Sequence, residues 1–266
     1  MLTPLLALIA ATGYGLASIL AARRLLHHEG PSKPLTLGLG YLAAMAHLAM
    51  LVVQVGAGDG QNLGLMNVAS MSSWVVVMFL TTAAIRLPVL QLLPLVHGFA
   101  AMVVLFAWLL PVPWVLHLAN EPQVVVHITL SLMAYALMVV AALYGLELAF
   151  INYQLKHKKL TALPAFLPPL MTVERQLFQL MLLGLLVLSL ALGSGFLFLE
   201  GMFEKAQLHK TVLSLLAWFL YGTALVMHYR SGWRGRGAVW VSLAGLGLLT
   251  LAYFGSRFVQ EVLLSS

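Results

Sequence analysis

The chain has 266 residues and a formal net charge of +6, yet only 8% of its residues are charged and 62% are hydrophobic. Soluble domains carry about 25% charged residues, so this composition, with a mean hydropathy of +0.98, excludes the soluble classes and predicts an integral membrane protein surrounded by lipid. The absence of cysteine further excludes disulfides, thiol nucleophiles and thiolate-bound metal centres.

Apolar segments of helical length recur along the whole chain, each near the ~20 residues that a helix needs to cross a bilayer. The strands of a membrane barrel are shorter and alternate in polarity, so this pattern favours an all-α bundle. We expect one polytopic membrane domain over residues 1–266, with about eight transmembrane helices. Their expected bounds are about 2–22, 35–55, 67–85, 87–110, 124–150, 176–199, 209–229 and 238–260.

Basic residues are distributed unevenly between the two sets of loops that these spans define. Eleven lie on one side: Arg23, Arg24, Lys33, Arg86, Lys156, Lys158, Lys159, Arg175, Arg230, Arg234 and Arg236. Three lie on the other: Lys205, Lys210 and Arg257. The positive-inside rule places the richer side in the cytoplasm, which predicts that both termini lie outside it. Because the charges are scattered between apolar segments, no nucleic-acid partner is expected.

Several histidines fall inside the spans or at their ends, where an ionisable side chain needs a partner or a purpose. In the fifth span His127, Ser131 and Tyr135 are spaced by four, so they form one polar stripe that should face other helices. In the seventh span four side chains share a sector of roughly 80°. They are Ser214, Trp218, Tyr221 and His228. A lined interior and helix–helix hydrogen bonding are both compatible with such stripes.

The second, third and fourth spans carry polar residues of the same kind. The stripe of the third span consists of Asn67, Ser70, Trp74 and Thr81. His47 shares with Gly40 a face of small residues suited to close helix packing. His97 follows Pro94 by three positions, and we interpret it as a partner for backbone groups that a proline kink leaves free.

The polar groups inside the spans favour one kind of chemistry over others. The only acidic residue there is Glu147, whereas cation carriers usually place acids in the membrane. Neither the Glu-x-x-His nor the His-Glu-x-x-His spacing of di-iron and zinc sites occurs. Neutral imidazoles among apolar and aromatic side chains suit haem iron. Candidate partners for the haem propionates are Arg230, Arg234 and Arg236 at one face, and Lys205 or Lys210 at the other.

Five stretches of the chain carry landmarks of a known family. They read "QNLGLMNVASMSSW", "HITLSLMAYALMVVAALYGLELAF", "KKLTALPAFLPPLMTVERQLF", "LLAWFLYGTALVMHYRSGWRGRGAVW" and "LAYFGSRFV". The most specific landmark is a histidine followed by a Gly-Trp-x-Gly-basic turn. In this order they resemble the cytochrome c assembly family, the CcsA, CcmC and HemX-like membrane proteins, and in particular its YpjD-type branch. The resemblance implies a multi-pass protein of the bacterial inner membrane.

The resemblance also implies roles for particular residues. His127 matches the outer histidine of the family and His228 its intramembrane histidine, so both are candidate iron ligands of non-covalently bound haem b, at one site or two. Candidate clamps for the propionates are Arg230, Arg234 and Arg236. The remaining candidates for cofactor binding are His47, His117, His209, Trp218 and Tyr135.

Two features of the family members that attach haem to cytochrome c are absent. Their tryptophan-rich WWD segment is replaced by "EGMFEKAQL", and no second outer histidine occurs in the C-terminal "RFVQEVLLSS". We therefore expect haem binding or handling without haem-ligase activity. The alternative is a transporter, or an accessory subunit of an ion-transport or respiratory complex with another inner-membrane protein as partner. An intramembrane enzyme has the least support, because no nucleophile–base pair or metal-spacing motif is found.

Overall fold

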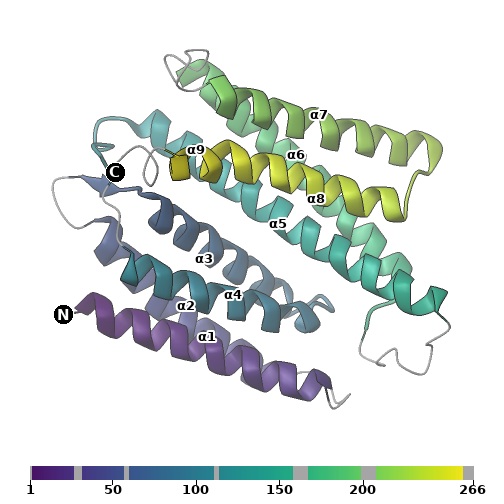
Figure 1. Cartoon of the computed structure of the whole chain (residues 1–266), viewed down its shortest axis with the longest axis horizontal. Coiled ribbons are helices and arrows are strands. Elements are labelled where there is room, and N and C mark those ends of the chain that lie inside the picture. Colours follow the sequence, from purple (N-terminus) through teal and green to yellow (C-terminus); the bar gives the residue numbers. More distant parts are fainter. Residues whose placement is uncertain are drawn as a thin grey trace. The chain divides into compact units, whose positions relative to one another are not determined.

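The computed structural model describes residues 2–26, 32–56, 60–110, 114–157, 167–198 and 208–259. These residues are almost entirely helical (Figure 1). Among them, eight helices are long and apolar enough to cross a membrane, as the sequence predicts. The orientation of the termini stays a prediction, and three of the basic residues behind it, Lys158, Lys159 and Lys205, lie outside the described residues.

The helices follow one another in chain order with few other elements. They are α1 (Leu2–Leu26), α2 (Lys33–Val55), α3 (Leu65–Ala83), α4 (Leu93–Leu109), α5 (Pro122–Lys156), α6 (Leu170–Phe198), α7 (Leu208–Ser231), α8 (Arg236–Thr250) and α9 (Ser256–Phe258). Two short strands, β1 (Gln61–Asn62) and β2 (Val115–Leu116), a 3-10 turn η1 (Leu90–Leu92) and a π-helical turn η3 (Leu251–Gly255) complete the described chain.

Helix α6 starts earlier than its apolar segment. It begins at Leu170 rather than near residue 176, directly after Pro168 and Pro169. Proline has a fixed backbone angle that suits the entry to a helix and lacks the N–H that an interior position needs. The early start adds the polar Glu174 to the helix, one turn before the buried Phe178.

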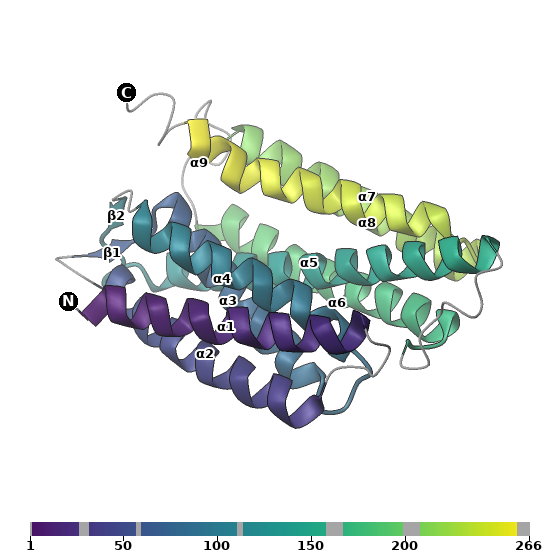
Figure 2. The same cartoon turned by 60° about the horizontal axis from the view of Figure 1, so that its bottom comes forward.

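The first compact unit contains α1 to α4 with β1, β2 and η1. In it α1 packs against α2 and α4, and α3 packs against the same two helices. Strands β1 and β2 pair antiparallel, with Gln61 opposite Leu116 and Asn62 opposite Val115, and they lie at the end of the unit where α1 begins (Figure 2). Small side chains let the helices approach closely, since a Cβ on Gly13 would lie 3.0 Å from that of Ala43.

The second compact unit contains α5 to α9 with η3. Helix α5 packs against α6 and α8, and α7 packs against α6 and α8; α7 and α8 lie side by side in both ribbon views. Gly145 faces Ser242, whose Oγ would lie 2.5 Å from an added Cβ, and Gly245 faces the ring of Tyr221. These two glycines bring α5, α7 and α8 into close contact. The expectation of one domain over residues 1–266 stays a prediction.

Candidate functional site

His127 lies on the second turn of α5 and is half-buried against α6. Its Nδ1 lies 3.0 Å from the backbone oxygen of Ala191 and 3.1 Å from Oγ of Ser194. A carbonyl oxygen can only accept, so Nδ1 carries the ring hydrogen and donates to it. The Ser194 hydroxyl donates to the same carbonyl over 2.8 Å. In the neutral ring Nε2 is then the unprotonated nitrogen, and it has no hydrogen-bond partner within the described ranges.

His228 lies in the last turn of α7 and is also half-buried. Its Nδ1 donates to the backbone oxygen of Trp233, 2.9 Å away, so this ring has the same tautomer as that of His127. The ring of Phe178 on α6 stacks on the imidazole with centroids 3.5 Å apart and planes inclined by 11°. In the neutral ring Nε2 again carries the lone pair, and no described residue forms a hydrogen bond with it.

The two histidines contact α6 at different heights. His127 meets it at Ala191 and His228 meets it at Phe178, thirteen positions earlier. At 1.5 Å rise per residue this separation is about 20 Å along the helix. One iron atom cannot be shared across that distance, so His127 and His228 define two separate places in the second unit.

Tyr135 and Trp218 connect neighbouring helices of the second unit. The Tyr135 hydroxyl lies 3.1 Å from Oγ1 of Thr250 on α8. Trp218 Nε1 donates to Oγ of Ser189 on α6 over 2.7 Å. Their polar atoms are thus engaged in helix–helix hydrogen bonds, and only their ring surfaces remain for other contacts.

Three arginines surround the turn that follows His228. Arg230, Arg234 and Arg236 are all exposed, and Arg234 Nε donates to the backbone oxygen of Gly232 over 3.2 Å. They place positive charge next to His228 without being buried, which is an arrangement that an anionic group can reach from outside the bundle.

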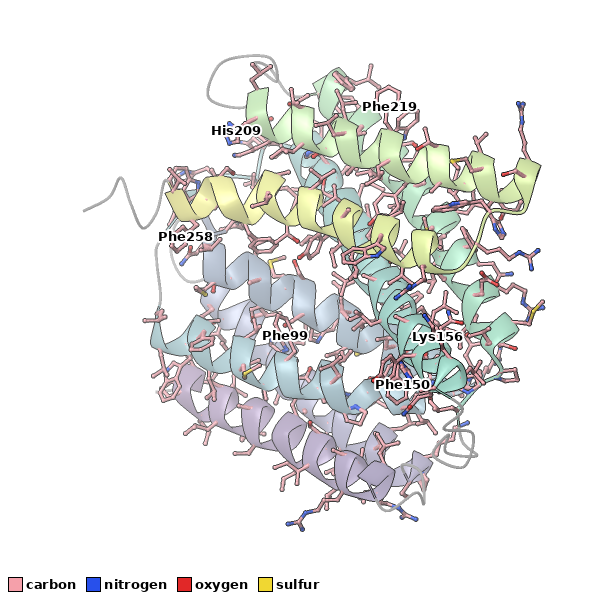
Figure 3. All side chains as sticks on the ribbon, turned by 45° about the vertical axis from the view of Figure 1, so that its right-hand side comes forward. Phe99, Phe150, Lys156, His209, Phe219 and Phe258 are labelled. Atoms are coloured by element: carbon pink, nitrogen blue, oxygen red, sulfur yellow. The ribbon has the colours of Figure 1, made fainter. Side chains whose placement is uncertain are left out.

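His209 and His117 are exposed, unlike the half-buried His127 and His228. His209 lies at the start of α7 and is exposed (Figure 3). His117 follows β2 in the first unit and is also exposed. Neither ring has the described backbone partner that fixes the tautomers of His127 and His228. Lys205, one of the two lysines proposed from the sequence to pair with haem propionates, lies outside the described residues.

His47 is fully enclosed in the first unit, with 0% of its surface exposed. Its Nδ1 lies 3.3 Å from the Tyr14 hydroxyl and its Nε2 lies 2.7 Å from Oγ of Ser70. Both ring nitrogens are therefore engaged by hydroxyl groups of α1 and α3. This is a histidine whose hydrogen-bonding capacity is satisfied inside a helix bundle.

His97 forms a cluster of three rings with Tyr14 and His47 in the first unit, and the sequence alone does not reveal this cluster. Its ring stacks on Tyr14 with centroids 5.6 Å apart, and Nε2 lies 3.4 Å from Oγ1 of Thr81. Pro94 lies in the first turn of α4, which begins at Leu93, so it removes no interior helical hydrogen bond, and His97 contacts Tyr14 and Thr81 instead. The signal that could have indicated the cluster is Tyr14 itself, a tyrosine alone among small and aliphatic residues of the first span.

The polar stripe of the third span is used in this packing. Ser70 and Thr81 contact the two histidines, and Trp74 Nε1 donates to the Ala44 carbonyl over 2.9 Å. Of the two interpretations left open by the spacing, helix–helix hydrogen bonding accounts for these three residues. Within the described ranges, no three histidine or acidic side chains lie close enough together to hold a metal ion by themselves.

The fold defines a polytopic helical membrane protein. Its second unit carries two histidines, His127 and His228, each with one nitrogen that has no described partner. A sequence profile of the family described as "Cytochrome C assembly protein" matches residues 32–264. The chain therefore belongs to the cytochrome c assembly family, which confirms the resemblance found in the sequence.

Individual relatives support the same placement. The chain is 39% identical over 262 residues to "Inner membrane protein YpjD" of Escherichia coli strain K12, covering 98% of this chain and 99% of the relative. It is 37% identical over 195 residues to an "Uncharacterized 28.8 kDa protein in nifR3-like 5'region" of Azospirillum brasilense, covering 70% and 71%. No solved structure matches. The protein is a multi-pass inner-membrane protein.

Proposed function

We propose that the protein binds haem b non-covalently through His127 and His228, at two separate sites, and handles haem without ligase activity. The observation that carries this proposal is the shared state of the two rings. Each donates Nδ1–H to a backbone carbonyl and keeps the Nε2 lone pair free of described partners. Histidines that bind metals in proteins characteristically donate their other ring N–H to a carbonyl or carboxylate in this way.

The surroundings of the two rings fit haem better than a small hydrophilic ion. Each ring is half-buried in a membrane helix bundle, and His228 lies face to face with Phe178. Haem supplies an iron atom that accepts imidazole nitrogen as an axial ligand. Arg230, Arg234 and Arg236 are the residues that would pair with propionates beside His228, since guanidinium and carboxylate form charge-assisted hydrogen bonds.

The absence of ligase activity is proposed from the sequence. The loop between α6 and α7 lies outside the described residues and contains no tryptophan, whereas the haem-attaching members of the family carry a tryptophan-rich segment there. The charge distribution further supports both termini outside the cytoplasm, which places His228 near the cytoplasmic face and His127 near the opposite one. Reporter tags at each terminus test this orientation.

The test is an absorption spectrum of protein purified in mild detergent from haem-replete cells, before and after reduction by dithionite. We expect sharp α and β bands from the unaltered protein and their loss when His127→Ala and His228→Ala are combined. The matched control combines His117→Ala and His209→Ala, which alters two exposed rings and should keep the spectrum. A featureless spectrum of the unaltered protein, persisting after haem is added, would contradict the proposal.

The second candidate is a transporter or an accessory subunit of a respiratory or ion-transport complex. It is favoured by the fully buried His47 and His97 of the first unit, because ionisable residues in membrane helices commonly mark a functional pathway. It predicts that changes to Asn67, Ser131 or Glu147 alter ion flux or the stability of a partner protein, in a chain that carries no haem.

A further inference from the structure

The turn between α7 and α8 has an unusual backbone that begins and ends with glycine. Gly232 and Gly235 have φ of 67° and 77°, a left-handed region that other residues adopt only with strain. Gly232 N–H donates to the His228 carbonyl over 3.0 Å and closes α7 with a left-handed cap. Between the two glycines lies Trp233, whose carbonyl accepts the hydrogen of His228 Nδ1.

One acidic side chain from another helix holds this turn. Glu174 Oε1, on α6, accepts the N–H of Gly235 over 3.0 Å. Glu174 is one helical turn before Phe178, so both side chains project from the same face of α6. Phe178 stacks on the His228 ring while Glu174 holds the turn that carries its hydrogen-bond acceptor.

The contacts form a connected path from Glu174 to the free nitrogen of His228. The direction of the Trp233 carbonyl depends on the conformation of the turn from Gly232 to Gly235. That carbonyl decides which ring nitrogen keeps its hydrogen, because a donated Nδ1–H leaves the lone pair on Nε2. Gly232 and Arg234 are exposed, whereas Trp233 donates its N–H to the Met227 carbonyl over 3.4 Å and its ring packs over Gly237 at the start of α8.

We propose that Glu174 is a positioning residue for His228. By accepting the N–H of Gly235 it fixes the conformation of the Gly-Trp-x-Gly turn, so that Nε2 of His228 is the nitrogen available to a ligand. The role of the ligand rests on the proposed function, whereas the control of the tautomer does not. An alternative role for Glu174 is the stabilisation of the α8 N-terminus by its negative charge alone. Two conservative variants distinguish these roles.

Glu174→Gln keeps an oxygen at the same reach and removes the charge. Glu174→Asp keeps the charge and shortens the side chain by one methylene, so it loses the hydrogen bond to Gly235. Positioning predicts that Gln preserves the site and Asp disrupts it. Stabilisation by charge alone predicts the opposite order. Arg175→Ala, a change at the neighbouring exposed position of α6, is the matched control.

The first measurement is the tautomer of His228 in haem-free protein, from nitrogen-15 chemical shifts of labelled histidine, with the signal assigned by its loss in His228→Gln. We expect the Nδ1–H form in the unaltered protein, in Glu174→Gln and in Arg175→Ala, and a mixture of tautomers in Glu174→Asp. An unchanged tautomer in Glu174→Asp would overturn the proposal.

The second measurement is haem affinity, titrated with hemin in the same detergent. Loss of a group that orients a metal ligand typically lowers affinity about 10- to 100-fold, and we expect a loss of that order for Glu174→Asp in a His127→Ala background, with Glu174→Gln within about twofold of that background. Equal affinities of the Asp and Gln variants would overturn the proposal. Failure of the unaltered protein to bind hemin would instead refute the proposed function, while the tautomer measurement would still decide the role of Glu174.

Discussion

The two units of the protein use histidine in opposite ways. In the first, His47 and His97 are fully buried; both nitrogens of His47 meet hydroxyl groups, while His97 has Nε2 near Oγ1 of Thr81 and its Nδ1 has no partner among the described residues. In the second, His127 and His228 are only half-buried, and each uses a single nitrogen on a backbone carbonyl. Full burial therefore does not by itself indicate a histidine that binds a ligand. The surroundings of the unengaged nitrogen separate the two kinds of histidine, because Nδ1 of His97 is enclosed in the bundle whereas Nε2 of His127 and of His228 belongs to a half-buried ring.

The largest effect on stability should come from His47→Leu. The change leaves the Tyr14 hydroxyl and Ser70 Oγ buried without their partner, at a cost of about 1–3 kcal/mol for each unsatisfied group. We expect a clear fall in the thermal unfolding temperature in detergent, with the haem spectrum of the folded protein unchanged. Loss of the haem bands at temperatures where this variant is still folded would remove the distinction between the two units.

Gly40→Ala should destabilise the first unit by a smaller amount. An added Cβ would lie 2.9 Å from Cε1 and Nε2 of His97, and overpacking of this kind costs about 1–3 kcal/mol. Gly38→Ala is the control on the same helix, because nothing lies within 4 Å of its added Cβ. It should be neutral or stabilising by up to ~1 kcal/mol, the gain of alanine over glycine in a helix. Equal unfolding temperatures for the two variants would show that His97 is not tightly enclosed.

Gly235→Ala should affect the second unit through its backbone. Gly235 has φ of 77° and ψ of −135°, a combination used almost only by glycine, and such backbone costs another residue about 1–3 kcal/mol. The strain falls on the turn whose Trp233 carbonyl accepts the hydrogen of His228 Nδ1. We expect weaker hemin binding in a His127→Ala background. Gly247→Ala, in the interior of α8 with open space around the added Cβ, is the control and should bind as before.

Arg234→Gln should have the smallest effect. The side chain is exposed, and exposed ion pairs contribute about 0–1 kcal/mol, so hemin affinity at the His228 site should fall by less than about fivefold. The difference should shrink further as salt is raised, because exposed charges are screened. A loss that is large and independent of salt would indicate that the arginine is enclosed when haem is bound.

The eight spans could be predicted from the sequence because hydrophobic length alone specifies them. The expected start of α6 near residue 176 was wrong, because Glu174, Arg175 and Gln176 have the polarity of a loop although they continue the helix from Leu170. Pro168 and Pro169 were the signal in the sequence that could have indicated the earlier start, because proline is favoured at the entry to a helix.

The candidate site was predictable only in part. The residue types and their landmarks identify His127 and His228, and the partner of His228 lies just five residues away at Trp233. The partners of His127 lie more than sixty positions away, at Ala191 and Ser194. Which helices are neighbours decides such contacts, and apolar periodicity does not determine it in a membrane bundle. The same reason hides the pairing of Tyr14 with His47.

The most direct test of the central claim is the haem-to-protein ratio of the unaltered chain, of His127→Ala, of His228→Ala and of the combined variant, each saturated with hemin and freed of excess. Two separate sites predict a ratio of two for the unaltered protein, one for each single variant and none for the combination. A ratio of one that either single change abolishes would mean that both histidines serve the same haem. That result would contradict the separation of about 20 Å along α6.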